Sequence, residues 1–256
     1  MESSVQQSSL DLATRLGVLS RRCRIVARRA ISPSLVEVVL RGDAASLAGV
    51  AGNDVMVLVS EGQGELARRR YSVRAVSEVE DTFTLWISTN HQGPGAQWAE
   101  RLYEGDEVDV VGPRGKITLS DTADWHLFVG DVSALGAFYR MAQNVEVPGR
   151  CVFVVELDDP SDALTVTFDP AVGVTAIFVD RQGRAYNDPA GLLSGLAALT
   201  LPPDEGHAYL FGEFLVTRTL RSALVDRGLR TEQISLKAYY RVGQGNGANG
   251  EPSKDL

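Results

Sequence analysis

The sequence predicts an antiparallel barrel of six strands, followed by an α/β domain whose sheet is mainly parallel. The first half carries short segments rich in Val and Ile, separated by turn clusters and without long helices. The second half alternates apolar runs with helical segments, the pattern of a parallel sheet. A chain of 256 residues is long enough for two modest domains.

The barrel strands are expected between residues 22 and 111. Turn-forming pairs such as Ser32-Pro33 and Glu80-Asp81 separate them, and a Gly-Pro-Gly turn predicts one helix from Gly95 to Leu102. The expected strands are 22–30, 35–40, 55–59, 71–76, 83–88 and 107–111.

The second half begins with an apolar strand from Trp125 to Val129, followed by the turn Gly130-Asp131. Apolar runs bounded by turn residues are typical of strands buried on both faces. Further strands are expected at 151–156, 175–179, 207–211 and 234–241, with helices at 133–144, 189–199 and 215–226. The domain limits are therefore 21–120 and 121–243, with a disordered N-terminus at 1–20 and a flexible tail at 244–256.

Composition excludes several classes of protein. A net charge of -8 argues against a general nucleic-acid binder. No apolar run approaches the roughly 18 residues of a membrane span, and none resembles the core of a signal peptide. Cys23 and Cys151 lie in separate regions, which favours two buried thiols in a reducing, cytoplasmic compartment. Neither they nor the histidines have the spacing of a metal site, and both a monomer and a homodimer stay open.

The segment from Arg69 to Arg74 offers a set of groups that suits a flavin nucleotide. A guanidinium presents a planar fork of donors to a pyrophosphate, and the chain has one at Arg69 and one at Arg74. The ring of Tyr71 can stack on an isoalloxazine, and the hydroxyl of Ser72 can hydrogen-bond the flavin. The alternative is a basic edge strand with a half-buried tyrosine.

About twenty residues later, a glycine-rich turn opens the predicted helix. Such a turn presents backbone N–H groups and the positive end of the helix dipole to a phosphate. A simple loop-to-helix cap is the alternative. The residues expected at the cofactor here are Asn90, His91, Gly93, Gly95, Ala96 and Gln97.

These motifs, in this order, resemble the siderophore-interacting protein family, the FAD-dependent ferric-siderophore reductases. The resemblance covers roughly residues 22 to 243. The family's Arg-x-Tyr-(Ser/Thr)-x-Arg, Gly-Pro-Ala-Ser-x-Trp, Gly-Pro-Arg-Gly, Gly-Asp-x-(Thr/Ser)-Ala-Leu-Pro-Ala and Tyr-Trp-Arg-x-Gly are matched by residues 69–74, 93–98, 112–115, 130–137 and 239–243.

Four positions depart from the family's pattern. The histidine before the phosphate loop aligns with Asn90, although His91 is adjacent, and the loop serine is Ala96. Both changes leave FAD binding in place. The proline of the second-domain turn is Gly136 and the tryptophan near the C-terminus is Tyr240, so the electron donor and the substrate are the open questions.

The resemblance implies FAD in the barrel and NADH or NADPH as electron donor, with a ferredoxin as an alternative donor. Ligands of parallel sheets bind at the carboxyl ends of the strands, which places the donor at Asp131, near Gly212-Glu213. A ferric siderophore or other small molecule would meet Lys237, Tyr240 and Arg241, with Arg218 and Arg221 nearby.

Reduction of a ferric siderophore to release Fe(II) is the expected function. Two alternatives are an FAD-binding enzyme of specialised metabolism that acts on an organic substrate, and a flavin reductase that supplies a monooxygenase.

Overall fold

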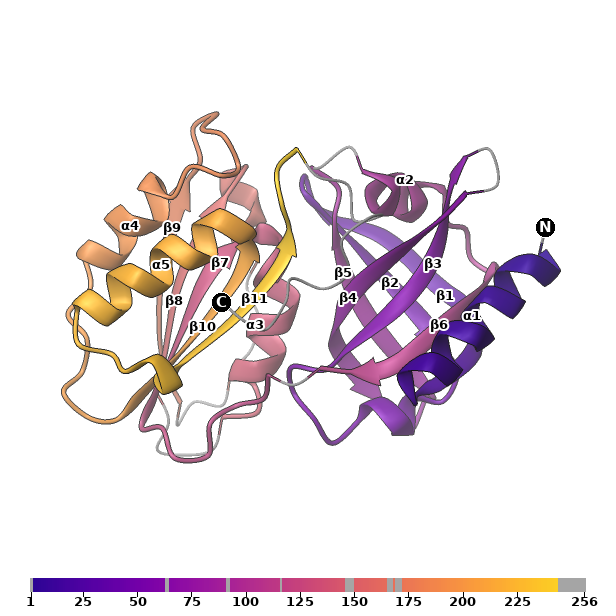
Figure 1. Cartoon of the computed structure of the whole chain (residues 1–256), viewed down its shortest axis with the longest axis horizontal. Helices are drawn as coiled ribbons and strands as arrows, with labels where there is room; N and C mark the ends of the chain where they lie inside the picture. The colour runs from indigo at the N-terminus through magenta and orange to yellow at the C-terminus, as the bar shows by residue number, and fades with distance from the viewer. Residues whose placement is uncertain are drawn as a thin grey trace. The chain divides into compact units, whose positions relative to one another are not determined.

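The chain folds into two compact units, Met1–Thr118 and Leu119–Gln244. The structure is a computed structural model that describes residues 2–62, 65–90, 93–115, 117–145, 150–164, 168 and 172–243. Each unit has its own sheet (Figure 1). The predicted tail at 244–256 lies outside the described residues.

The first unit is a closed barrel with the strand order β1-β2-β5-β4-β3-β6, in which every neighbouring pair is antiparallel. The prediction of a six-stranded antiparallel barrel is confirmed. The strands are β1 (Leu19–Ser32), β2 (Leu35–Arg41), β3 (Asp54–Gly62), β4 (Glu65–Ser77), β5 (Thr82–Ser88) and β6 (Glu107–Arg114).

Alternate side chains of these strands fill the barrel interior. Val38 and Leu40 of β2 face Phe83 and Leu85 of β5 in the same buried cluster. Helix α2 (Pro94–Arg101) adds the fully buried Ala99 to this cluster, with the ring of Trp98 packed against it. The core therefore fixes the position of α2 on the barrel, where one short 3₁₀ turn (Ala44–Leu47) also packs.

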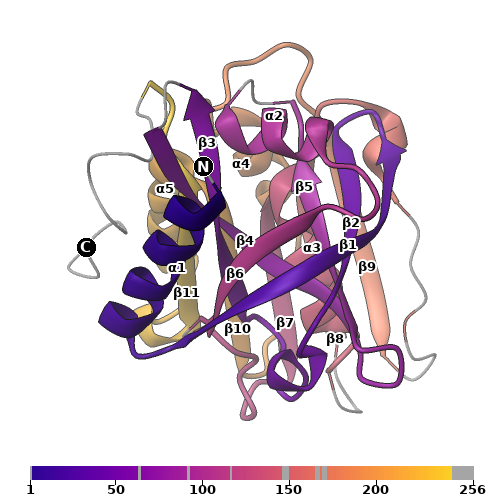
Figure 2. The ribbon, with the colours of Figure 1, turned by 90° about the vertical axis from the view of Figure 1, so that its right-hand side faces the viewer.

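The N-terminal segment is helical, in contrast to the prediction from the sequence. Helix α1 (Glu2–Leu16) stands where a disordered segment was expected, and it lies against β1 and β6 (Figure 2). Leu12 and Ala13 are 2% and 4% exposed and pack on Met56 and Val111 of the barrel's outer surface. The prediction was wrong because tertiary packing of a few apolar residues stabilises a helix that is otherwise polar.

The second unit is a five-stranded sheet with the order β11-β10-β7-β8-β9 and only parallel pairs. The predicted parallel α/β domain is confirmed. Its strands are β7 (Trp125–Asp131), β8 (Arg150–Leu157), β9 (Gly173–Asp180), β10 (Gly206–Glu213) and β11 (Ile234–Tyr240). Its helices are α3 (Leu135–Ala142), α4 (Ala190–Ala197) and α5 (Phe214–Asp226), with 3₁₀ turns at Val132–Ala134, Pro160–Asp162 and Thr231–Gln233.

Helices cover both faces of this sheet, with α4 and α5 on one face and α3 on the other (Figure 1). Strand β7 shows the division, because successive side chains point to opposite faces. Leu127 and Val129 pack in the cluster that contains residues of α4 and α5. Phe128 instead meets Phe138 of α3, with ring centroids 5.4 Å apart.

Both cysteines are buried free thiols, as the sequence predicts. Burial raises the pKa of Cys23 and of Cys151 to about 12, so neither is a nucleophile at neutral pH. Within the described ranges, no helix combines the length and the apolar character that crossing a membrane requires.

The face of the sheet that carries Phe128 also holds a buried histidine. His126 is 3% exposed, and its Nδ1 lies 3.3 Å from the hydroxyl oxygen of Tyr209. Its pKa is lowered to about 4, first because burial disfavours the charged ring and second because His207 would add a like charge. His207 itself lies 2.9 Å from the hydroxyl oxygen of Ser235. Both histidines are structural.

We expect acid to weaken this unit through His126. Below its unfolded pKa of about 6.5 the unfolded chain binds a proton that the folded unit excludes, so stability falls between pH 6.5 and 4. Through this residue, the free energy of unfolding is about 2 kcal/mol lower at pH 5 than at pH 7. Urea unfolding at both pH values should therefore show a smaller loss for His126→Gln than for the wild type. An equal loss in the two proteins would contradict the assignment.

Candidate functional site

Strand β4 places Tyr71 at the edge of the barrel core. Its ring packs against the buried cluster and stacks on Trp98 of α2, with centroids 5.5 Å apart and planes 19° apart. Residues 69, 71 and 73 share one face of an extended strand, and Val73 on this face is 1% exposed. The strand and the helix that follows the glycine-rich turn are therefore held together by aromatic packing.

Gly95 lets the first turn of α2 approach β4. A Cβ at this residue would lie 2.7 Å from the hydroxyl oxygen of Tyr71 and 3.5 Å from Cγ and Cδ of Arg69. Gly93 is the N-cap and offers no side-chain hydrogen bond, and Pro94 follows it. The first N–H groups of α2 thus have no side-chain cap, and they lie next to a guanidinium-bearing residue.

The donor groups at this corner of the barrel suit the phosphate groups of a flavin nucleotide. The hydroxyl oxygen of Tyr71 is buried and has no hydrogen-bond partner among the described residues. Burial raises the pKa of Tyr71, so its hydroxyl stays protonated and can donate. A buried donor without a partner costs free energy, which a ligand acceptor would recover. Together with the uncapped helix start, Tyr71 and Arg69 form a donor set that suits a phosphate-bearing ligand.

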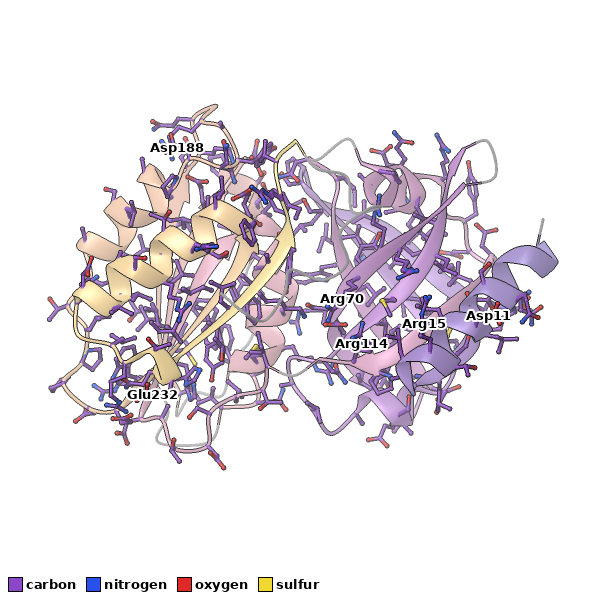
Figure 3. All side chains as sticks on the ribbon, in the orientation of Figure 1. Asp11, Arg15, Arg70, Arg114, Asp188 and Glu232 are labelled. Carbon is purple, nitrogen blue, oxygen red and sulfur yellow. The ribbon has the colours of Figure 1, made fainter. Side chains whose placement is uncertain are left out.

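The other two arginines of the segment have different surroundings. Arg70 donates to both carboxylate oxygens of Asp54, at 3.1 and 2.6 Å, and Asp54 is fully buried. Arg70 and Arg114 lie on the α1 side of the barrel (Figure 3). The guanidinium of Arg74 lies over the ring of Trp86 in β5, 4.9 Å from its centroid. Arg74 lies five positions along the strand from Arg69, roughly 16 Å away, so the two would contact different parts of an extended ligand.

The remaining residues predicted at the cofactor lie on β4, after β5 and in α2. Ser72 lies opposite Asp54 in the register of β3 and β4. Asn90 accepts a hydrogen bond from the hydroxyl of Ser88, Ala96 is 6% exposed, and Gln97 is exposed. His91 lies outside the described residues.

The second predicted group of residues lies at the carboxyl ends of the parallel strands. Asp131 ends β7; its Oδ1 accepts from the N–H of Ser133 at 2.9 Å, and its Oδ2 accepts from the hydroxyl of Tyr240 at 2.8 Å. Glu213, at the end of β10, caps α5 through the N–H groups of Leu215 and Val216. Burial, and then the Asp131 carboxylate, raise the pKa of Tyr240, which keeps its hydroxyl protonated.

Two arginines and two acids next to Asp131 were missed by the sequence analysis. Glu156, 2% exposed at the end of β8, forms ion pairs with Arg181 at 2.6 Å and with Arg184 at 3.0 Å. Arg181 also pairs with Asp158 at 2.7 Å, and its guanidinium lies 4.3 Å from the ring centroid of Tyr186. The signal in the sequence was a charged residue at the end of an apolar run, which indicates a functional strand end.

Lys237, Tyr240 and Arg241 each contact a different neighbour. Lys237 lies over the rings of Phe211 and Tyr239, at 5.8 and 5.4 Å from their centroids. Tyr240 reaches Asp131, as described above. Arg241 lies 4.9 Å from the ring centroid of Phe214, on which Arg218 also packs at 5.6 Å. The structure thus brings Arg241 and Arg218 together, and both are exposed.

Two family models match this chain. The model described as the siderophore-interacting FAD-binding domain matches residues 56–117, and the one described as siderophore-interacting protein matches residues 123–243. The FAD-binding model matches the later part of the first unit, including Arg69, Tyr71 and Gly95, and the other model matches most of the second unit. FAD as the cofactor is confirmed by this match, whereas the contacts of individual residues with it stay predictions.

Curated relatives are similar over part of their length. An uncharacterized protein of Mycobacterium tuberculosis is 27% identical over 162 residues, which is 59% of this chain and 56% of that protein. The ferric vibriobactin reductase ViuB of Vibrio cholerae is 28% identical over 95 residues, 37% of this chain and 35% of ViuB. The matches thus span about half or less of these relatives.

The fold also occurs in solved structures. A siderophore utilization protein from T. fusca superposes with a TM-score of 0.74 at 23% identity, covering 90% of this chain and 95% of that one. The ferredoxin-NADP+ reductase of Plasmodium falciparum gives a TM-score of 0.71 at 11% identity, covering 86% and 96% of the two chains. At these identities the likeness shows the ferredoxin-reductase-like fold, with which a nicotinamide electron donor is consistent.

We expect Arg69→Ala to weaken FAD binding. Loss of one charge-assisted contact to a phosphate costs about 1.5–3 kcal/mol, which is roughly ten- to a hundredfold in affinity. Fluorescence titration of flavin-free protein with FAD measures the change. Arg68→Ala is the matched control, because Arg68 is the exposed neighbour on the same strand and should bind FAD as the wild type does. Equal affinity for all three proteins would remove Arg69 from the site.

Proposed function

Because this chain belongs to the siderophore-interacting protein family, we propose that it is an FAD-dependent reductase that passes electrons from NADH or NADPH to a ferric siderophore. The similarity to the ferric vibriobactin reductase supports this choice of substrate class. The siderophore then releases its iron, because siderophores bind Fe(II) far more weakly than Fe(III).

Bound FAD supplies the link between a two-electron donor and a one-electron acceptor, since it takes a hydride and passes on single electrons. The overall reaction is balanced when one NAD(P)H reduces two Fe(III) to two Fe(II) and releases one proton. The protein's own part is to bind the cofactor and to bring donor and ferric chelate to it.

The observation that carries the proposal is the approach of α2 to β4 at Gly95. It brings Arg69, the unpartnered hydroxyl of Tyr71 and the uncapped N–H groups of α2 to one corner of the barrel. A guanidinium and helix N–H groups bind phosphate oxygens, and a buried phenol can donate to a neutral acceptor of the ligand. These residues would hold and orient the cofactor.

An anionic substrate is supported by the two exposed arginines around Phe214. Arg218 and Arg241 place two guanidiniums at one ring, in a chain whose net charge is -8. A local positive patch attracts an anion even when the whole protein is acidic, because field strength falls off over about 10 Å at 0.1 M salt. Lys237 of β11 is a separate positive charge, because it lies over Phe211, whose ring packs on Phe138 of α3 on the other face of the sheet.

The first test is reduction of a ferric siderophore under anaerobic conditions. We expect NADH or NADPH to bleach the flavin absorbance of the purified protein, and added ferric siderophore to restore it. An Fe(II) chelator should capture two iron ions for each NAD(P)H consumed. Free FAD at the same concentration is the control.

Failure at each step has a separate meaning. A flavin that neither dinucleotide reduces at millimolar concentration would exclude the nicotinamide donor and favour a donor such as a ferredoxin. A flavin that is reduced but is not reoxidised by ferric siderophores would exclude the iron substrate. FAD that exchanges freely during turnover would favour a flavin reductase that supplies a monooxygenase.

A second test concerns the charge of the substrate. Lys237→Ala and the double variant Arg218→Ala/Arg241→Ala should each raise KM for an anionic ferric siderophore, because each removes positive charge from the approach. Association with the wild type should also slow as salt is added. Arg150→Ala, which removes an exposed arginine paired with Asp204, is the control. If neither KM nor the association rate changes with these variants or with added salt, a neutral organic substrate is indicated.

A further inference from the structure

Tyr240 crosses a strand to reach its hydrogen-bond partner. In the sheet order β11-β10-β7, strand β10 separates the strand of Tyr240 from that of Asp131. The hydroxyl of Tyr240 nevertheless donates to Oδ2 of Asp131 at 2.8 Å. Gly212 of β10 makes this path open, because a Cβ there would lie 2.7 Å from the same Oδ2. The side chain of Tyr240 therefore spans the carboxyl end of β10.

The ring of Tyr240 is also fixed from its other side. Tyr186 meets it edge to face, with centroids 6.4 Å apart, and Arg181 lies over Tyr186. Arg181 is only 4% exposed and is bound to Glu156 and Asp158. Because its neighbours are held by buried ion pairs, Tyr240 has a defined place at the edge of the sheet.

That place is the switch point of the sheet. The chain leaves β7 towards α3 on one face and leaves β10 towards α5 on the other face (Figure 1). In open parallel sheets, ligands bind outside the carboxyl ends of the two strands where the connections diverge. In this chain, the phenol of Tyr240 lies across those two strand ends.

We infer that Tyr240 controls access of the electron donor, closing the dinucleotide position at β7 and β10 through its hydrogen bond to Asp131. The inference rests on the proposed nicotinamide donor and adds a residue that sets its affinity. A donor that binds only the open arrangement has its apparent affinity reduced by the fraction of open molecules. Weakening the hydrogen bond raises that fraction and tightens binding.

The variant that tests this inference is Tyr240→Phe, which keeps the ring and removes the donor hydroxyl. A hydrogen bond to a carboxylate is strong enough that we expect about tenfold tighter binding of the dinucleotide. NAD+ and NADP+ serve as probes, because calorimetry with the oxidised, FAD-loaded protein then measures binding without electron transfer. In turnover, KM for the donor should fall.

Tyr239→Phe is the matched control. It also removes one hydroxyl from β11, but its ring packs on Phe211, 5.7 Å away, and it should bind as the wild type does. Asp131→Asn weakens the same hydrogen bond from its other end. The effects of Tyr240→Phe and Asp131→Asn should therefore be non-additive in a double-mutant cycle.

The possible outcomes separate this inference from the proposed function. Unchanged or weaker dinucleotide binding by Tyr240→Phe overturns the inference, as do additive effects in the cycle. If no variant binds NAD+ or NADP+, the inference fails together with the nicotinamide donor. If binding tightens but no Fe(II) forms from a ferric siderophore, the inference holds and the iron substrate fails.

Discussion

A Cβ at Gly95 would lie 2.7 Å from the hydroxyl oxygen of Tyr71, closer than real Cβ contacts come. The cofactor corner of the barrel depends on this constraint, because only a residue without a side chain lets the start of α2 meet β4 there. Gly212 has the same role in the second unit, where the missing side chain gives Tyr240 its path to Asp131. In both units a backbone requirement decides which functional groups meet.

Charged side chains have two different roles at the cofactor corner and at the carboxyl ends of the parallel strands. At the barrel corner, Arg70 is bound to the buried Asp54, and neither Arg70 nor Arg74 is among the groups nearest Gly95. At the sheet edge, the buried Glu156 is neutralised by Arg181 and Arg184. A buried charge that loses its partner is strongly destabilising. The three arginines paired with buried acids, Arg70, Arg181 and Arg184, therefore hold the scaffold, while exposed ones such as Arg218 are available to a ligand.

The sequence was sufficient for both sheets, because their two hydrophobic patterns differ physically. Strands such as Phe83 to Ser88 alternate between core and surface, whereas Trp125 to Asp131 is buried throughout. It was not sufficient for α1, whose few apolar residues matter only because Met56 and Val111 present an outer apolar surface to them. Such a surface arises from strands far apart in the chain and has no local signal.

The same distinction holds for the candidate sites. The meeting of Arg69, Tyr71 and the glycine-rich turn was predictable, because each part has its own motif and the barrel brings them together. Tyr240 was named as a candidate site residue, but its hydrogen-bond partner Asp131 could not be predicted from β11 alone. The alternation of side chains along a strand predicts on which face of the sheet a side chain lies. It does not predict that a glycine in the neighbouring strand lets this side chain reach the strand after it. The hydrogen bond of Tyr240, which replaces the family's tryptophan, therefore depends on Gly212 and Asp131, two residues of other strands, and not on its own segment.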